Sequence, residues 1–230
     1  LGRFGGGVGV ARWLCAQGAA VTVSDMATED RLADSVRQLA DCDLALHLGG
    51  HDLAHIRDTD LLVVNPAVPP DHPLLREAAA VPQTTAINLF LERCPAPVVA
   101  ITGSAGKSTT TAMTGAILSE NRTVHVGGNI GVSLLETLPA IADDHVVVME
   151  LSSFQLERLP AIGISPHVAV VTNIRPNHLD RHGTMERYID AKKNIFRFQG
   201  PGDVLVLCGS DPALAEWAPA APGTVAFFYP

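Results

Sequence analysis

The sequence predicts an α/β protein with a Rossmann-like first unit and a second, doubly wound unit of the P-loop type with a mostly parallel sheet. Apolar, β-branched runs alternate with helical segments along the whole chain, which is the pattern of βαβ units. Each half contains a glycine-rich turn that leads into a helix near its start. Apolar runs in both halves end in an acid, Asp25 in the first and Glu150 in the second, where open α/β sheets bind ligands.

Size and composition exclude several classes of protein. The chain has 230 residues, 47% of them hydrophobic and 17% charged, which indicates a folded protein with a sizeable core. The net charge of −8 disfavours nucleic-acid binding, which needs a basic surface. The four cysteines stand apart in sequence, so neither a zinc site nor a disulfide framework is indicated. We find no signal peptide and no apolar run near the ~20 residues of a membrane helix.

The first unit, residues 1–94, reads as a Rossmann-like domain whose opening strand is missing. A glycine-rich turn that includes Gly5, Gly7 and Gly9 precedes a helix and then a strand ending at Asp25, although the six-residue dinucleotide fingerprint is not matched. Asp25 accepts sugar hydroxyls or caps the next helix; the sequence leaves both open. The elements that we expect, in order, are helix 10–17, strand 20–25, helix 31–39, strand 44–46, strand 60–65, helix 74–80, strand 83–86 and helix 88–93.

The second unit, residues 95–230, follows a proline-containing linker at residues 94–97 and is expected to be incomplete at its C-terminal end. The elements that we expect are strands 98–102, 123–126, 145–150, 168–173, 204–207 and 225–227, with helices 111–120, 184–196 and 211–217.

A phosphate-binding loop joins the first strand and helix of this second unit. The run Gly103-Ser104-Ala105-Gly106-Lys107-Ser108-Thr109 is a shortened form of the nucleotide-loop pattern, because Ile101 stands where a further glycine is usual. Backbone N–H groups and the helix dipole favour phosphate oxygens there. Lys107 is placed to reach the β- and γ-phosphates, and the Ser108 hydroxyl to bind Mg²⁺. The alternative is an ordinary turn with a helix cap, but the buried strand before it favours a phosphate site.

Three further residues are candidates for the same site. Glu150 ends an apolar strand and is either a magnesium ligand or a surface acid. His178 lies in a polar loop with Asn173, Asn177 and Asp180 after another strand, whereas a lone histidine elsewhere is usually structural. Lys192 and its neighbour Lys193 read, from the residues alone, as the solvated face of a helix.

Four motifs in this order resemble the Mur ligase family, and most of all its D-glutamate-adding branch. They are TGSAGKST at residues 102–109, GGNIG at 127–131, ELSSFQLE at 150–157 and NHLDR at 177–181. ELSSFQLE is the most discriminating. Members have a Rossmann-like UDP-sugar domain, a central ATPase and a C-terminal domain; we expect this chain to hold the first two and to be inactive alone.

The resemblance implies a cytoplasmic, monomeric enzyme that uses ATP to join D-glutamate to UDP-N-acetylmuramoyl-L-alanine through an acyl phosphate, in peptidoglycan precursor synthesis. It implies two Mg²⁺ ions, held by Ser108, Glu150, His178 and a carbamylated Lys192. Lys107 would share the catalytic role with Glu150, His178 and Lys192. The remaining substrate contacts that it implies are at Gly5, Gly7, Gly9, Asp25, Asn129, Ser152 and Gln155.

Two departures and two alternatives accompany this resemblance. Ala105 stands where the family often has Asn, and Arg175-Pro176-Asn177 replaces a more acidic run. Neither departure falls on an expected metal ligand. A related ligase with another acceptor, either a sister muramyl ligase or a folylpolyglutamate synthase, is one alternative. The other is a nucleotide-binding module without ligase activity.

Overall fold

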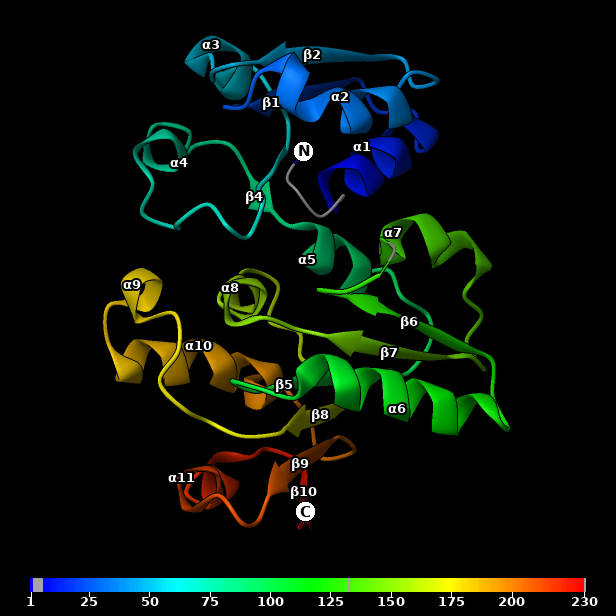
Figure 1. Cartoon of the computed structure of the whole chain (residues 1–230), viewed down its shortest axis with the longest axis vertical. Coiled ribbons are helices and arrows are strands. Elements are labelled where there is room, and N and C mark those ends of the chain that lie inside the picture. The colour runs from blue at the N-terminus through cyan, green and yellow to red at the C-terminus, as the bar shows by residue number, and fades with distance from the viewer. Residues whose placement is uncertain (2–5, 132, 230) are drawn as a thin grey trace.

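The computed structural model describes residue 1, residues 6–131 and residues 133–229. Within them the first half of the chain forms α1 (Gly6–Ala16), β1 (Val21–Asp25), α2 (Glu29–Gln38), β2 (Leu44–Leu48), α3 (Leu53–Arg57), β3 (Leu62–Val63), α4 (Pro73–Glu77), β4 (Gln83–Thr84) and α5 (Ala86–Leu91). The strands of this half pair in parallel as two separate ladders, β1 with β2 and β3 with β4. Figure 1 shows this half at one end of the molecule.

The second half forms a parallel sheet with helices packed against it. Its elements are β5 (Val98–Thr102), α6 (Lys107–Ser119), β6 (Val124–Gly128), α7 (Leu134–Thr137), β7 (Val146–Glu150), α8 (Ser153–Leu156), β8 (Val168–Val171), α9 (Leu179–His182), α10 (Met185–Arg197), β9 (Val204–Cys208), α11 (Pro212–Ala215) and β10 (Thr224–Phe228), with 3₁₀ turns at 138–140, 159–161 and 218–220. In the described residues the sheet has six strands in the order β10-β9-β8-β5-β7-β6. The mostly parallel, α/β architecture predicted from the sequence is confirmed.

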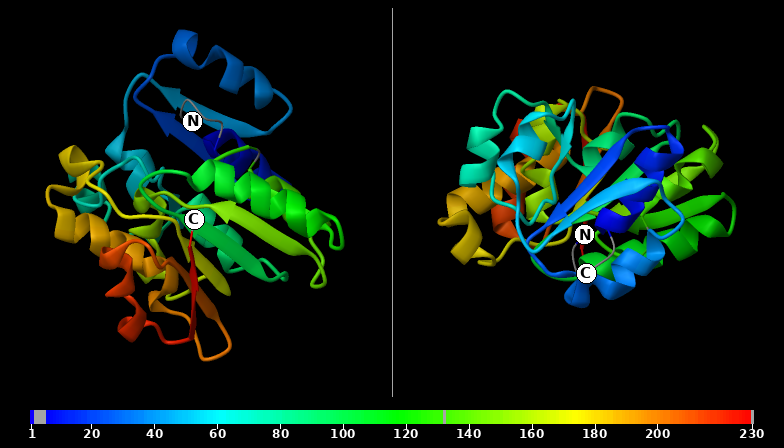
Figure 2. Two further views of the ribbon diagram at one scale, coloured as in Figure 1. Left: turned by 60° about the horizontal axis from the view of Figure 1, so that its bottom comes forward. Right: turned by 90° about the horizontal axis from the view of Figure 1, so that it is seen from above.

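The strand order places the glycine-rich loop after β5 at a switch point of the sheet. From β5 the chain crosses to β6 on one side, whereas from β7 it returns past β5 to β8. Because such crossovers are right-handed, connections that run in opposite directions lie on opposite faces. Helix α6 accordingly packs on β5, β6 and β7, while α10 packs on β5 and α8. Figure 2 shows the same layers from two other sides. Open sheets bind ligands at such a point, outside the carboxyl ends of the strands.

The main hydrophobic core surrounds this sheet and extends into the first half. Strand residues such as Ala100, Val147 and Leu205 are fully buried, as continuous apolar runs of a parallel sheet require. Trp13 of α1 and Phe90 of α5 belong to the same cluster. A second, small cluster lies between α1, α2 and β1–β2, around Leu32 and Leu39. The helix before the expected boundary at residue 94 therefore packs against the second half.

Two expectations about the first half are wrong. The strand expected over residues 60–65 is only two residues long, because its partner follows Pro82, which has no N–H to donate to a ladder. The glycine-rich turn ends earlier than expected, since α1 already begins at Gly6 and includes Gly7 and Gly9. A Cβ on Gly9 would lie 2.2 Å from Cβ of Ser133, so the missing side chain lets α1 approach the segment that begins α7. Gly5 lies outside the described residues.

None of the helices in the described part of the chain has both the length and the apolar character needed to cross a membrane.

Candidate phosphate and magnesium site

The phosphate-binding loop takes its shape from its glycines and continues directly into α6. Gly106 caps the helix with φ of 79°, a left-handed conformation that costs other residues energy. The first-turn N–H groups of α6, at Lys107, Ser108 and Thr109, have no acceptor within the helix, because an α-helix leaves its leading donors free. These groups and the helix dipole favour an anion at the end of β5. Lys107 Nζ lies 3.4 Å from the Ser104 carbonyl oxygen, within the loop itself.

Glu150 lies beside this loop, as expected from its place at the end of β7. Its side chain is buried, and both carboxylate oxygens accept hydrogen bonds: Oε2 from the Ser108 hydroxyl at 2.5 Å and Oε1 from Asn129 Nδ2 at 3.0 Å. The Asn129 N–H also donates to the Glu150 carbonyl at 2.9 Å. The structure therefore brings together the loop serine, the strand-end acid and the amide of the GGNIG segment. The surface-acid interpretation of Glu150 is wrong.

The close pairing of Asn129 with Glu150 depends on Gly128. Its φ is 97°, and a Cβ at this position would lie 2.3 Å from the Glu150 carbonyl oxygen. No side chain fits there without displacing β7. Gly128 thus serves close backbone packing, while the Asn129 side chain donates to the carboxylate.

Lys192 is buried in α10 against the same loop, so the solvated-face interpretation is wrong for this residue. Its Nζ donates to the Gly103 carbonyl at 2.9 Å and to Thr102 Oγ1 at 3.1 Å. Burial, together with the nearby charge of Lys107, lowers the pKa of Lys192 to about 7, while Glu150 opposes the shift. A buried lysine with such a pKa holds a large neutral fraction near neutral pH, unlike a surface amine. Lys193 lies over the Trp217 ring instead, 5.4 Å from its centroid.

His178 belongs to a neighbouring cluster. It has φ of 52°, and among the described residues it is the non-glycine residue with positive φ. Its ring lies 5.0 Å from that of Phe154, and Phe154 also stacks on His182 at 5.4 Å. Within the described part of the chain, no hydrogen bond or ring contact joins His178 to Lys107, Ser108 or Glu150. Such strained backbone is costly, by roughly 1–3 kcal/mol, and is typical of functional positions.

Ser152 and Gln155, both expected near the substrate, form the capping box of α8. The Ser152 hydroxyl accepts from the Gln155 N–H at 3.3 Å, and Gln155 Oε1 accepts from the Ser152 N–H at 2.9 Å. The motif S-x-x-Q before an apolar residue is the sequence signal for this arrangement. In the first half, the Asp25 carboxylate accepts from the Ala27 N–H at 2.9 Å. Substrate contacts at these positions stay predictions.

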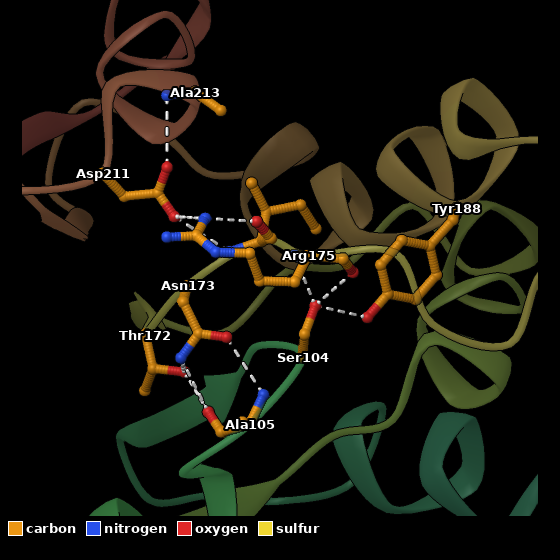
Figure 3. Close-up of polar contacts among 9 residues, drawn as sticks. Ser104, Ala105, Thr172, Asn173, Arg175, Tyr188, Asp211 and Ala213 are labelled. Carbon is orange, nitrogen blue, oxygen red and sulfur yellow. Dashed lines mark hydrogen bonds and ion pairs between the residues drawn. The ribbon is translucent and has the colours of Figure 1, made fainter.

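Sequence reasoning missed the residues that fasten the loop. Asn173 donates through Nδ2 to the Ala105 carbonyl at 2.9 Å and accepts from the Ala105 N–H at 3.0 Å. Ser104 and Tyr188, 84 residues apart, have hydroxyl oxygens 2.9 Å apart (Figure 3). The polar pair Thr172-Asn173 directly after β8 was a visible signal for Asn173. Nothing in the helical pattern of α10 distinguishes Tyr188 from an ordinary core residue.

The donor set suits magnesium. In the described residues no group of three or more His, Cys, Asp or Glu side chains is placed to hold a metal ion. Ser108 and Glu150 nevertheless supply hard oxygen atoms in contact with each other at the mouth of the phosphate loop. Magnesium prefers oxygen ligands and is held in nucleotide sites by one or two protein groups together with phosphates. The pair therefore fits a magnesium ion bound with a nucleotide.

Comparison with protein families matches both halves of the chain. Residues 1–85 match the family described as "Mur ligase MurD-like, N-terminal domain", and residues 101–229 match "Mur ligase middle domain". The UDP-N-acetylmuramoylalanine–D-glutamate ligase of Roseiflexus sp. (strain RS-1) is 46% identical over 222 residues, which cover 95% of this chain and 47% of that protein. The enzyme of the same name from Symbiobacterium thermophilum is 44% identical, over 94% of this chain and 48% of that protein.

Solved structures agree on the fold. A UDP-N-acetylmuramate:L-alanyl-gamma-D-glutamyl-meso-diaminopimelate ligase from Neisseria meningitides superposes with a TM-score of 0.66 at 17% identity, covering 99% of this chain and 75% of that one. MurF ligase from Thermotoga maritima gives a TM-score of 0.53 at 20% identity, covering 94% of this chain and 49% of that one. The chain spans about half the length of the curated relatives it matches. Its phosphate loop, its strand-end acid and the match over residues 101–229 together show that this chain belongs to the Mur ligase family.

Proposed function

We propose that the protein carrying this chain is an ATP-dependent ligase that joins D-glutamate to UDP-N-acetylmuramoyl-L-alanine and releases ADP and phosphate. The relatives at 44–46% identity carry that name over nearly the whole of this chain. The observation that carries the chemical part is the contact between Ser108 and Glu150 at the mouth of the phosphate loop. This arrangement supports an ATP site whose magnesium ligands are Ser108 and Glu150.

The reaction requires a positioned triphosphate more than a reactive side chain. The substrate carboxylate attacks the γ-phosphorus, an acyl phosphate forms and ADP leaves; the D-glutamate amine then attacks the acyl carbon and phosphate leaves. Phosphoryl transfer depends on positioning and on charge neutralisation. Lys107 and the N–H groups at the start of α6 bind the phosphates, and Ser108 with Glu150 would hold magnesium. Bound magnesium supplies positive charge against the phosphate oxygens.

A second magnesium site with a carbamylated Lys192 is the finer part of the proposal. A neutral amine adds to carbon dioxide, forms an N–C bond and loses a proton, which leaves an anionic oxygen ligand. The support is the buried position of Lys192 and its pKa of about 7, because a protonated lysine cannot make that bond. His178, from the neighbouring cluster, would complete this site.

The carbamate has its own test. Carbon-13-labelled bicarbonate added to the intact protein should give one carbamate resonance that Lys192→Ala removes and Lys193→Ala retains. Short carboxylic acids should partly restore activity to Lys192→Ala by filling the vacated anionic position. A native spectrum without that resonance, or a fully active Lys192→Ala protein, would contradict the carbamate. Lys192 would then be a free amine that donates a hydrogen bond to the Gly103 carbonyl.

The remaining assignments rest on place in the fold. We propose residues 1–94 as the UDP-sugar domain, with Gly5, Gly7, Gly9 and Asp25 near the nucleotide, and residues 95–230 as the ATP domain. Asn129, Ser152 and Gln155 are proposed to face the substrate from the ends of β6 and β7. We further propose a monomeric protein of the cytoplasm, where activated precursors of this kind are assembled.

The specificity is tested by phosphate release. The intact protein, given ATP, Mg²⁺ and UDP-N-acetylmuramoyl-L-alanine, should release phosphate with D-glutamate and not with L-alanine or diaminopimelate. Release with a different amino acid alone would assign the protein to a sister activity. Lys107→Ala should abolish release, with Lys193→Ala as the matched control; an active Lys107→Ala protein would remove the ATP site from the proposal.

A further inference from the structure

The Ser104 hydroxyl has no hydrogen-bonding capacity left for a phosphate. Its proton is donated to the Arg175 carbonyl oxygen at 2.8 Å, and its oxygen accepts from the Arg175 N–H at 2.8 Å. The third neighbour is the Tyr188 hydroxyl at 2.9 Å. Because the serine proton is already committed to a carbonyl, Tyr188 must be the donor in that contact. A hydroxyl has one proton and two lone pairs, so all three are used.

The next residue of the loop is fastened just as completely. The Asn173 side chain accepts from the Ala105 N–H and donates to the Ala105 carbonyl, and Thr172 Oγ1 donates to the same carbonyl at 2.8 Å. The Ser104 N–H also donates to the Asn173 carbonyl at 3.1 Å. The leading half of the loop is therefore bound to the segment after β8, and the N–H groups of Gly106 to Thr109 stay available.

Asp211 anchors that segment in turn, as Figure 3 shows. Its carboxylate accepts from the Ile174 N–H at 3.2 Å, from Arg175 Nη1 at 2.7 Å and from the Ala213 N–H of α11 at 3.2 Å. The Asp211 side chain is 4% exposed, whereas that of Arg175 is 64% exposed. A buried carboxylate with three donors is a rigid support. Arg175 links it to Ser104, because its side chain donates to Asp211 and its backbone is hydrogen-bonded to the Ser104 hydroxyl.

Tyr188 and Lys192 bring α10 against the other side of the loop. They lie four residues apart, one turn of helix, so they share a face. Tyr188 donates to Ser104 Oγ, while Lys192 Nζ donates to the Gly103 carbonyl. Helix α10 thus binds Gly103 and Ser104, and the segment after β8 binds Ser104 and Ala105.

We propose that Ser104 is a positioning residue: its hydroxyl holds the phosphate loop in its nucleotide-binding shape, with Tyr188 and the Asp211–Arg175 pair as its supports. This inference rests on the proposed ATP site and changes the role expected for Ser104 within it. A loop already fixed by the protein loses less conformational entropy when a triphosphate binds, so its supports raise affinity without touching the ligand. Ser104 then acts through the backbone of Gly106 to Thr109.

The test is a double-mutant cycle on the dissociation constant for Mg-ATP, measured by calorimetry on the intact protein. Ser104→Ala should weaken binding by about tenfold, a value of the order lost when one hydrogen-bonded partner is removed. Tyr188→Phe should weaken it less, and should have no further effect in the Ser104→Ala background, because coupled residues are non-additive. Asp211→Asn, which keeps an acceptor for α11, should also weaken binding. Ser119→Ala, a serine at the far end of α6, is the matched control.

The outcomes separate this inference from the proposed function. If the native protein does not bind Mg-ATP, the proposed function fails. If it binds, and Tyr188→Phe and Asp211→Asn bind as tightly as the native protein while Ser104→Ala does not, Ser104 contacts phosphate directly and the inference is overturned. Unchanged binding by Ser104→Ala also overturns it. Ser104→Thr, which keeps the hydroxyl, should recover most of the affinity lost in Ser104→Ala, and the KM for the UDP-sugar should stay unchanged throughout. Should Asp211→Asn fail to fold, the Ser104 and Tyr188 cycle decides alone.

Discussion

The Ser108 hydroxyl donates a 2.5 Å hydrogen bond to Glu150 Oε2 although 42 residues separate the two in sequence. The contact exists because β5 and β7 are adjacent parallel strands, so that the loop after one meets the last residue of the other. Ile101 pairs directly with Glu150 in this ladder. A strand order that separated β5 from β7 would leave the acid and the serine on different parts of the sheet edge.

Replacement of the buried acid tests the magnesium assignment. Glu150→Gln keeps an acceptor for Asn129 and the shape of the side chain but removes the charge. We expect phosphate release to fall by at least about 100-fold, because a neutral amide is a poor magnesium ligand and developing phosphate charge loses its counter-ion. The measurement is the initial rate as a function of Mg²⁺ concentration. Glu120→Gln, at the exposed end of α6, should behave as the native protein; equal rates for both variants would contradict the assignment.

The buried amine of Lys192 predicts a pH-dependent stability. Because its folded-state pKa is lowered to about 7 from 10.5, the unfolded chain binds one more proton than the folded chain between these values. Stability therefore rises with pH across this window, with a slope of up to about 1.4 kcal/mol per pH unit from this group. Below pH 7 the amine is charged in both states and the slope disappears.

Urea unfolding of the intact protein from pH 7 to 10, in buffer free of carbon dioxide, measures that slope. Lys192→Met should flatten it, since methionine does not titrate, and Lys193→Met should leave it in place. A native slope that Lys192→Met does not change would mean that another group titrates in this range.

Gly128→Ala should destabilise the protein by about 1–3 kcal/mol through a clash that Gly163→Ala lacks. Both glycines have positive φ, 97° and 63°, so both variants incur the backbone cost. Only at Gly128 does the new Cβ meet the Glu150 backbone, at 2.3 Å, whereas nothing lies within 4 Å at Gly163. Thermal unfolding midpoints measure the difference. Equal shifts for the two variants would show that β6 gives way freely and that the approach to Glu150 is not tight.

Two arginines of the second half hold the proline-rich loop of the first. Arg158 Nη2 donates to the Val68 carbonyl at 2.9 Å and Arg181 Nη2 donates to the same oxygen at 3.4 Å. We expect Arg158→Met to release residues 66–73 and to raise their cleavage rate in limited proteolysis several-fold, since access to a protease follows local opening. Arg57→Met, on the surface and paired with Glu77, is the control. An unchanged cleavage rate would show that the loop is held by its prolines alone.

Local pattern determined a large part of this structure in advance. The apolar run before Gly103, the Gly-Lys-Ser-Thr sequence and the acid after a valine-rich strand predicted a strand, a phosphate loop, a helix and a charged sheet edge, because periodicity and turn chemistry act over a few residues. The same reasoning failed for Asp60–Asn65, where the apolar run was long but its partner strand is only Gln83–Thr84, directly after Pro82.

The tertiary structure alone decided which groups are buried and which partners they have. A helix with adjacent lysines does not reveal that Lys192 points into the loop and Lys193 onto Trp217. The sequence also does not reveal that the Ser104 hydroxyl is hydrogen-bonded to Arg175 and Tyr188, which leaves it no proton or lone pair for a ligand. The pairs that Ser104 and Lys192 form lie 71 to 90 residues apart, and their distances follow from strand order and helix packing, which no local stretch of sequence contains.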